Sequence, residues 1–193
     1  MDTSHWLPAD KPQNYAIWSG RIIPDKGVHL AIQAAQLAGV QLKICGPIHD
    51  AGYFSRHVRP LLNRQTTYLG SLSTQALAEQ VAQASVFLCT PCWDEPFGLV
   101  AAEALSSGTP IAGFSRGALT EIVTPETGIL VPETVDALAQ AIGQAQQLSR
   151  ANCRRRAIER FSMTRMIQNY IQLYQTVVSD HSRLKPLALP LVS

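Results

Sequence analysis

Short apolar runs alternate along this chain with longer segments in which apolar residues recur every three or four positions. The runs have the length of strands, and the recurrence is typical of helices that bury one face. Strands that are apolar on both faces belong in a parallel sheet covered on both sides, so the pattern predicts a doubly wound α/β fold. The expected strands, about six, are 15–18, 42–45, 66–69, 86–89, 109–112 and 128–131. The expected helices are 28–38, 53–62, 74–81, 96–107, 119–123, 132–148, 149–160 and 164–178.

The stretch after the fourth strand is the most informative part of the sequence. Pro96 suits the first turn of a helix, where its missing N–H would be unpaired anyway, and Gly108 suits the left-handed position just past the helix end. Gly98 lets a ligand approach the free amides of the helix start, which attract anions. Glu95 lies at the strand-to-helix turn, and Glu103 lies about 12 Å further along the helix. The stretch predicts a phosphate at the helix tip and hydroxyl groups beside each carboxylate, and the alternative is two solvated glutamates.

Charged residues and glycines also follow the other predicted strands. Ligands of doubly wound sheets bind beyond the carboxyl ends of the strands, and in a parallel sheet those ends share one edge. The sequence therefore predicts a single site at that edge. Its members are Arg21 and Lys26 after the first strand, Gly46 after the second, Gly70 after the third, Glu95 after the fourth and Arg116-Gly117 after the fifth.

Composition places the chain among globular proteins. It has 193 residues, of which 46% are apolar and 16% charged, enough for one domain with a substantial core. The net charge of +2 is too small to indicate a nucleic-acid binder. There is no apolar run of membrane-spanning length, and the first residues lack the pattern of a signal peptide. We expect a cytoplasmic protein, with peripheral attachment to a membrane as the second option.

The four cysteines are expected to be free thiols in a reducing compartment. Cys89 and Cys92 have the spacing of a redox motif, but they end a strand instead of beginning a helix, so packing is the better interpretation. His49 and His57 are expected to be polar surface residues. The basic run Arg154-Arg155-Arg156, with Arg150 and Arg160, is expected to be a solvated face, with docking of a partner domain as the second option.

A resemblance narrows the interpretation. Glu95-Pro96-Phe97-Gly98, followed by Glu103-Ala104-Leu105 and Gly108-Thr109-Pro110, resembles the E-x7-E signature of retaining glycosyltransferases, and more narrowly that of family 4. The resemblance covers about residues 15–180 and implies one Rossmann-like half of the two-domain GT-B architecture. It further implies a donor-binding domain that transfers a hexose from a nucleotide-diphosphate sugar to an unknown acceptor. No metal or other cofactor is expected, and no H-E-x-x-H or D-x-D cluster occurs.

The resemblance also implies roles for individual residues. Arg21 and Lys26, in the loop that begins at Gly20, would hold the donor diphosphate and neutralise its charge as it leaves. Glu95 would meet the transferred sugar, and Glu103 would accept hydrogen bonds from the ribose hydroxyls. Gly46 and Gly70 would complete the donor site, and residues 70–72 lie where the family reads the base.

Main-chain amides are expected to contribute as well. By resemblance, those of Phe97 and Gly98 would contact the sugar hydroxyls, and those of Leu99 and Val100 the distal phosphate. The side chain of Phe97 is expected in the core. The family often has Gly-Gly-x-Pro-Glu where this chain reads Arg116-Gly117-Ala118-Leu119-Thr120-Glu121. Arg116 is therefore either a contact to the donor or a partner, or simply exposed.

A complete GT-B enzyme has a second domain that binds the acceptor, and the expected organisation here is a lead-in (1–14, loosely held), one domain (15–180) and a tail (181–193). The last helix, with Tyr170, Ile171, Tyr174 and Val177, resembles the one that packs on the N-terminal domain. We expect this domain alone to be inactive, and to need an N-terminal acceptor domain or a partner chain. Its exposed helix could also form a homodimer.

Two other function classes share features with this sequence. A non-catalytic nucleotide- or protein-binding module that kept the fold remains the alternative, although the presence of Arg21, Lys26, Glu95 and Glu103 together favours the enzyme. A dinucleotide-dependent oxidoreductase is disfavoured, because no G-x-G-x-x-G follows the first strand.

Overall fold

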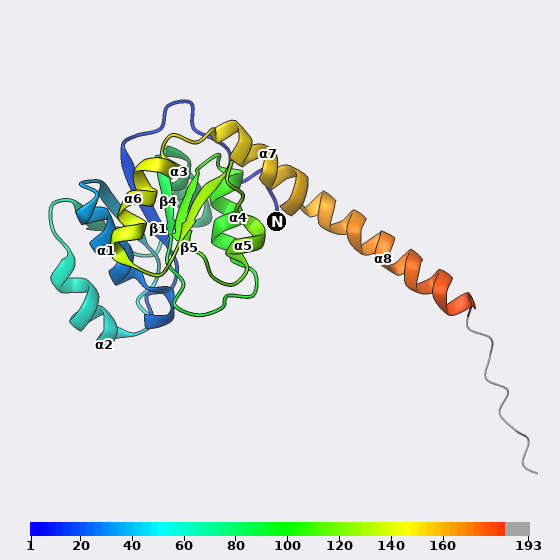
Figure 1. Ribbon diagram of the computed structural model, residues 1–193, viewed down its shortest axis with the longest axis horizontal. Coiled ribbons are helices and arrows are strands. Elements are labelled where there is room, and N and C mark those ends of the chain that lie inside the picture. Colours follow the sequence, from blue (N-terminus) through cyan, green and yellow to red (C-terminus); the bar gives the residue numbers. More distant parts are fainter. Residues whose placement is uncertain (184–193) are drawn as a thin grey trace, which may run out of the picture.

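The computed structural model describes residues 1–183, which form a six-stranded parallel sheet flanked by helices, with one long helix projecting from it (Figure 1). The strand order is β3-β2-β1-β4-β5-β6. The first three strands therefore extend the sheet to one side of β1 and the last three extend it to the other side, so the strand order switches between β1 and β4. This order and the parallel pairing confirm the doubly wound prediction. The strands are β1 (Tyr15–Ser19), β2 (Gln41–Cys45), β3 (Thr66–Tyr68), β4 (Val86–Cys89), β5 (Ile111–Phe114) and β6 (Gly128–Val131).

Helices cover both faces of the sheet, and Figure 1 shows α1 and α6 on one side of the strands and α4 and α5 on the other. Alternation along β1 explains the two layers: Ala16 and Trp18 pack with α1 and α6, whereas Tyr15 and Ile17 pack with α3, α4 and α7. The helices are α1 (Val28–Leu37), α2 (Ala51–Tyr53), α3 (Thr74–Gln83), α4 (Leu99–Ser106), α5 (Leu119–Ile122), α6 (Val135–Ala145), α7 (Arg150–Phe161) and α8 (Met163–Arg183).

The central helix starts later than the sequence indicated. Pro96 was expected in its first turn, but α4 begins at Leu99, and Gly98 precedes it with φ +66°. A residue in the left-handed region cannot continue a right-handed helix, so Gly98 sets the boundary. Gly108 has φ +69° and ends the helix as expected.

Two further elements differ from the prediction. The expected helix over 53–62 consists of α2, a π-helical turn (Phe54–Val58) and a 3-10 turn (Arg59–Leu61), and Pro60 cannot donate the N–H that a continuous helix would need. The fifth strand begins at Ile111, two residues later than expected. Thr109 lies in the turn that closes α4, since its N–H donates to the carbonyl of Ala104 at 2.8 Å.

The lead-in is not loosely held. Trp6 is only 5% exposed, and its carbonyl accepts hydrogen bonds from Arg154 at 2.7 Å and from the Ser106 hydroxyl at 3.3 Å. The Met1 amino group donates to the carbonyl of Phe161 at 2.7 Å. The lead-in is therefore packed against α4 and α7.

The basic run on α7 is largely used inside the molecule, which corrects the expectation of a solvated face. Arg154 donates to the carbonyls of Thr3, Trp6 and Ser106. Arg150 donates to the carbonyls of Ala82, Ala84 and Ser107. These two guanidinium groups satisfy carbonyls at the ends of α3 and α4 and fasten α7 to both.

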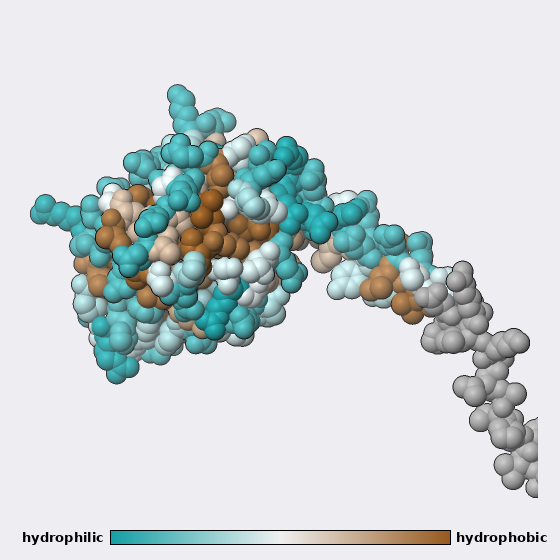
Figure 2. Space-filling view, viewed as in Figure 1, coloured by the Kyte–Doolittle hydropathy of each residue, from teal (hydrophilic) through white to brown (hydrophobic). Residues whose placement is uncertain are grey.

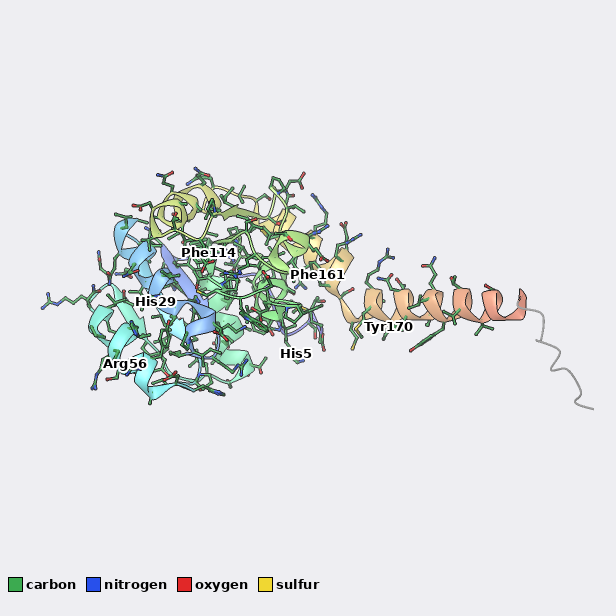
Figure 3. The ribbon with its side chains drawn as sticks, turned by 60° about the horizontal axis from the view of Figure 1, so that its bottom comes forward. His5, His29, Arg56, Phe114, Phe161 and Tyr170 are labelled. Carbon is green, nitrogen blue, oxygen red and sulfur yellow. The ribbon has the colours of Figure 1, made fainter. Side chains whose placement is uncertain are left out.

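Helix α8 leaves the domain at Ser162, and Figure 3 shows its side chains, Tyr170 among them, projecting into open space. Apolar atoms also appear on its surface in Figure 2. The exposed apolar residues are Met163, Met166, Ile167, Tyr170, Ile171, Leu173, Tyr174, Val177 and Val178. The helix runs to Arg183, and the rest of the expected tail lies outside the described residues. Within residues 1–183, no helix has the length and apolarity to cross a membrane.

Candidate functional site

Three glycines stand side by side at the carboxyl ends of β1, β2 and β3. The Gly46 N–H donates to the carbonyl of Gly70 at 2.8 Å. Gly46 has φ +136°, and a Cβ atom there would lie 1.9 Å from the carbonyl oxygen of Gly20. Only glycine allows the two loops to approach so closely. The structure thus brings together Gly20, Gly46 and Gly70, as the sequence predicted.

The loop after β1 presents Lys26 to the same edge. A 3-10 turn, Pro24–Lys26, ends at Gly27, whose φ is +60°. The Lys26 carbonyl accepts a hydrogen bond from the Thr90 hydroxyl at 3.0 Å, and that hydroxyl accepts one from the Trp18 indole N–H at 3.1 Å. Sequence reasoning missed Thr90 and Trp18. A polar residue directly after the buried strand β4 was the available signal.

Lys26 and Glu95 form an ion pair. Lys26 Nζ lies 2.6 Å from Glu95 Oε1, and the two side chains are only 16% and 23% exposed. Together with Trp18, Gly20 and Val100, they line a pocket between the ends of β1 and β4. The neighbouring loop holds the Glu95 backbone, because the Ala118 N–H donates to the Glu95 carbonyl at 2.9 Å. A cation and a carboxylate thus share one pocket at the switch in strand order.

The start of α4 borders this pocket. Among the described residues, the main-chain amides of Gly98, Leu99 and Val100 donate to no protein acceptor, as is usual for the first turn of a helix. Phe97 is 56% exposed, so the expectation that its side chain lies in the core is wrong. With the Phe97 amide, these groups can receive an anion or hydroxyl oxygens at the positive end of the helix.

Glu103 lies on the same helix and is partly buried. Burial raises the pKa of its carboxyl to about 7. Among the described residues, no hydrogen-bond donor or cation pairs with this carboxyl. An unpaired carboxyl with such a pKa can accept hydrogen bonds from ligand hydroxyls once it is ionised.

Arg21 and Arg116 differ in their surroundings. Arg21 is exposed, and within residues 1–183 its side chain forms no hydrogen bond or ion pair. Arg116 donates from Nη1 to Glu133 Oε2 at 2.6 Å and from Nε to Asp94 Oδ1 at 3.3 Å. Arg116 is therefore not simply exposed: it joins the segments that follow β4 and β6.

The cysteines and histidines singled out from the sequence show no sign of a catalytic or metal-binding role among the described residues. Burial raises the pKa of the Cys89 thiol to about 12, and burial with the nearby Glu133 raises that of Cys92 to about 11, which agrees with packing. His49 and His57 are both exposed, as expected, and the His57 ring also lies 5.6 Å from that of Tyr53. The described residues contain no cluster of three or more side chains suited to hold a metal ion.

Comparison with known families gives one match over most of the chain. The family model of "Glycosyl transferases group 1" matches residues 5–160. Among curated proteins, the MMP alpha-(1->4)-mannosyltransferase of Mycolicibacterium hassiacum is 32% identical over 171 residues, covering 81% of this chain and 41% of the relative. This chain spans only about half the length of the curated relatives it matches, or less.

Solved structures of the same kind share the fold. HepE of Anabaena, in complex with UDP and glucose, superimposes with a TM-score of 0.74 at 21% identity, covering 93% of this chain and 55% of that one. The C-terminal domain of a group 1 family glycosyl transferase (LpcC) from Francisella tularensis gives a TM-score of 0.71 at 21% identity. In that comparison, 84% of this chain matches 99% of the other.

Proposed function

The chain belongs to the group 1 glycosyl transferases, and from this premise we propose that it is the donor-binding half of a retaining glycosyltransferase. It binds a nucleotide-diphosphate sugar, whose hexose is transferred to an acceptor held elsewhere. The free thiols fit a reducing compartment, so we propose a cytoplasmic location.

The Lys26–Glu95 pair carries this proposal. Transfer of a hexose leaves a nucleoside diphosphate, whose developing negative charge must be stabilised. Lys26 supplies a cation at the pocket, and Arg21, exposed on the same loop, supplies a second. Glu95 then accepts hydrogen bonds from hydroxyls of the sugar. One pocket thus offers a positive side for the leaving group and a negative side for the transferred group.

Glu103 and the amides of α4 complete the donor site. The amides of Leu99 and Val100 face the distal phosphate, and those of Phe97 and Gly98 the sugar. Glu103 accepts hydrogen bonds from the ribose hydroxyls, which compensate the carboxylate for its loss of water. Residues 70–72, next to the row of glycines, contact the base. No metal is needed for this arrangement, since Arg21 and Lys26 neutralise the diphosphate.

The second half of the enzyme lies outside this chain. Relatives are about twice as long, and the LpcC domain that this chain matches is described as C-terminal. The exposed apolar residues of α8 are a suitable surface for an N-terminal, acceptor-binding domain or a partner chain. We therefore propose that this chain alone binds the donor and turns over essentially nothing.

Titration calorimetry tests the proposal. The chain is titrated with UDP, GDP and ADP, and with their glucose, mannose and N-acetylglucosamine conjugates. Saturable binding of one nucleotide, lost in Glu103→Ala and kept in the exposed control Glu79→Ala, supports a donor site. Binding of none of them contradicts it and favours the alternative, a non-catalytic module that kept the fold. Robust transferase activity of these 193 residues would contradict the need for a second half.

A further inference from the structure

Several loops at the carboxyl edge are linked in a closed ring of contacts. The ring starts at the ion pair of Lys26 and Glu95. On one side, Asp25, next to Lys26, accepts a hydrogen bond on its carbonyl from the Cys92 N–H at 2.8 Å. On the other side, Asp94, next to Glu95, pairs with Arg116 at 3.3 Å. With the bond from the Thr90 hydroxyl to the Lys26 carbonyl, the loop after β1 and the loop after β4 are thus joined three times.

Glu133 is the last member of the ring. Its carboxylate accepts a hydrogen bond from Arg116 Nη1 at 2.6 Å, and its charge helps to raise the pKa of the Cys92 thiol. Glu133 comes from the segment between β6 and α6. Arg116 therefore connects segments that follow three different strands, β4, β5 and β6.

The residues just after Arg116 rest on the backbone of Glu95. Gly117 has φ +52°, and a Cβ atom there would lie 2.6 Å from the Glu95 nitrogen and 2.7 Å from its carbonyl oxygen. Ala118 donates its N–H to that same carbonyl at 2.9 Å. The contacts that hold Arg116 in place therefore also hold the backbone of Glu95, which carries the carboxylate.

We propose that Arg116 is a positioning residue that sets the orientation of Glu95 toward the sugar part of the donor. The inference rests on the proposed function, because it presumes that Glu95 meets that sugar. In this role Arg116 acts through Asp94, Glu133 and the 117–118 backbone, and not by contact with the donor. The fork of its guanidinium can hold two carboxylates at once, which a lysine ammonium does less well.

Substitution of Arg116 is expected to change the orientation of Glu95 more than the stability of the fold. Its side chain is 35% exposed and its partner Asp94 is 79% exposed, and ion pairs in such surroundings contribute little to stability. Glu103, which the proposed function places at the ribose, lies about one turn into α4 and outside the ring, so nucleotide binding should not depend on the ring. Loss of Arg116 should therefore weaken recognition of the sugar alone.

Two readouts on the full chain test this. The first is the ratio of the affinities for a sugar nucleotide and for its nucleoside diphosphate, using UDP-glucose with UDP, GDP-mannose with GDP and ADP-glucose with ADP, whichever pair binds best. Arg116→Ala should lower the affinity for the sugar nucleotide about fivefold. It should change the affinity for the nucleoside diphosphate by no more than about twofold. Arg116→Lys should recover part of the loss, and Glu133→Gln should show a smaller loss of the same kind.

The second readout needs no ligand. Amide hydrogen exchange of Ala118 reports the bond to the Glu95 carbonyl, and Arg116→Ala should speed it at least about fivefold without changing exchange within β5. Arg155→Ala is the matched control, because Arg155 forms an exposed ion pair with Glu126 away from this edge. It should change neither readout.

The outcomes separate the two proposals. If wild type binds no nucleotide, the proposed function fails, and the exchange of Ala118 alone decides whether Arg116 holds Glu95. If wild type binds but Arg116→Ala lowers the affinity for both ligands by the same factor, the positioning role is overturned. It is also overturned if neither affinity changes. Unchanged Ala118 exchange in Arg116→Ala overturns it as well.

Discussion

Lys26 Nζ and Glu95 Oε1 lie 2.6 Å apart although the two residues are 69 positions apart in the chain. Each comes from a loop at the end of a different strand, β1 or β4, and those strands are neighbours in the sheet. The pair therefore depends on the switch in strand order, the place where ligands of such sheets bind.

Removing one member of this pair has two consequences. Lys26→Ala leaves Glu95 without its cation in a mostly buried pocket, so we expect a loss of about 1–2 kcal/mol and a fall in Tm of about 3–6 °C. Affinity for the donor should fall about tenfold, since a phosphate contact is lost. Lys11→Ala, in the exposed part of the lead-in, is the control and should leave both unchanged. A Lys26→Ala protein with normal Tm and normal donor affinity would remove the basis of the proposed mechanism.

Glu103 predicts a dependence of stability on pH. Its pKa of about 7 in the folded protein lies above the ordinary value of 4.5, so the carboxyl adds no penalty below the ordinary value, the penalty grows as pH rises from there to about 7, and it stays constant above that. Glu103→Gln should therefore raise Tm by about 3–6 °C at pH 8 and by less than about 2 °C at pH 4.5. Thermal unfolding followed by circular dichroism at both pH values measures this. An equal shift at both would mean that the carboxyl does not titrate near 7.

The same group predicts a dependence of donor binding on pH. A ligand that bonds to the ionised carboxylate favours loss of its proton, so affinity should rise between pH 6 and pH 8 and binding should release protons. A sugar nucleotide is the suitable probe, because its diphosphate is esterified at both ends. Glu103→Gln should flatten the profile. Calorimetry in two buffers of different ionisation enthalpy counts the protons, and a pH-independent affinity in wild type contradicts the assignment.

Gly46→Ala should be among the most damaging single substitutions. The new Cβ would collide with the Gly20 carbonyl at a φ of +136°, so we expect a loss of about 3 kcal/mol or more, or no folded protein. Gly143→Ala is the opposite control: it lies within α6 and its Cβ meets nothing within 4 Å, so it should stabilise by up to about 1 kcal/mol. Chemical denaturation compares the two. Similar stabilities of the two variants would show that the fold does not need the close approach of Gly46 to the Gly20 carbonyl.

The cysteines should react slowly. With pKa values of about 12 and about 11, Cys89 and Cys92 carry almost no thiolate at pH 8. Alkylation with iodoacetamide should therefore be far slower than that of a free thiol and should speed up above pH 9. Mass spectrometry of peptides after timed quenching follows each residue. Rapid modification of Cys92 at pH 7 would reopen the redox interpretation.

Much of the fold and of the candidate site could be predicted from sequence for identifiable reasons. Strands such as 86–89 are apolar at every position, and this signal does not depend on distant contacts. Glycines after successive strands indicated the carboxyl edge, where the structure packs Gly20, Gly46 and Gly70 together. Lys26 and Glu95 were both placed at that edge, although their pairing was not foreseen.

The errors occurred where local signals conflict or distant contacts decide. Pro96 favoured a helix start, but α4 begins only after Gly98, whose φ of +66° is a backbone conformation that the sequence does not reveal. The basic run looked solvated because charged residues usually are. Arg150 and Arg154 instead hold carbonyls from segments 43 to 151 positions away, contacts that only the folded chain creates.

Helix α8 has the geometry of a lever. Its 21 residues span roughly 30 Å, and within the described chain it is anchored only at its root, where Met163 donates its N–H to the carbonyl of Met1. A turn of about 10° at Ser162 would carry the far end through about 5 Å. The root itself is stiff, because Arg154 ties α7 to the end of α4, the helix that bears Glu103. A displacement at the far end of α8 therefore acts on the rest of the described chain through this root, over a much shorter distance.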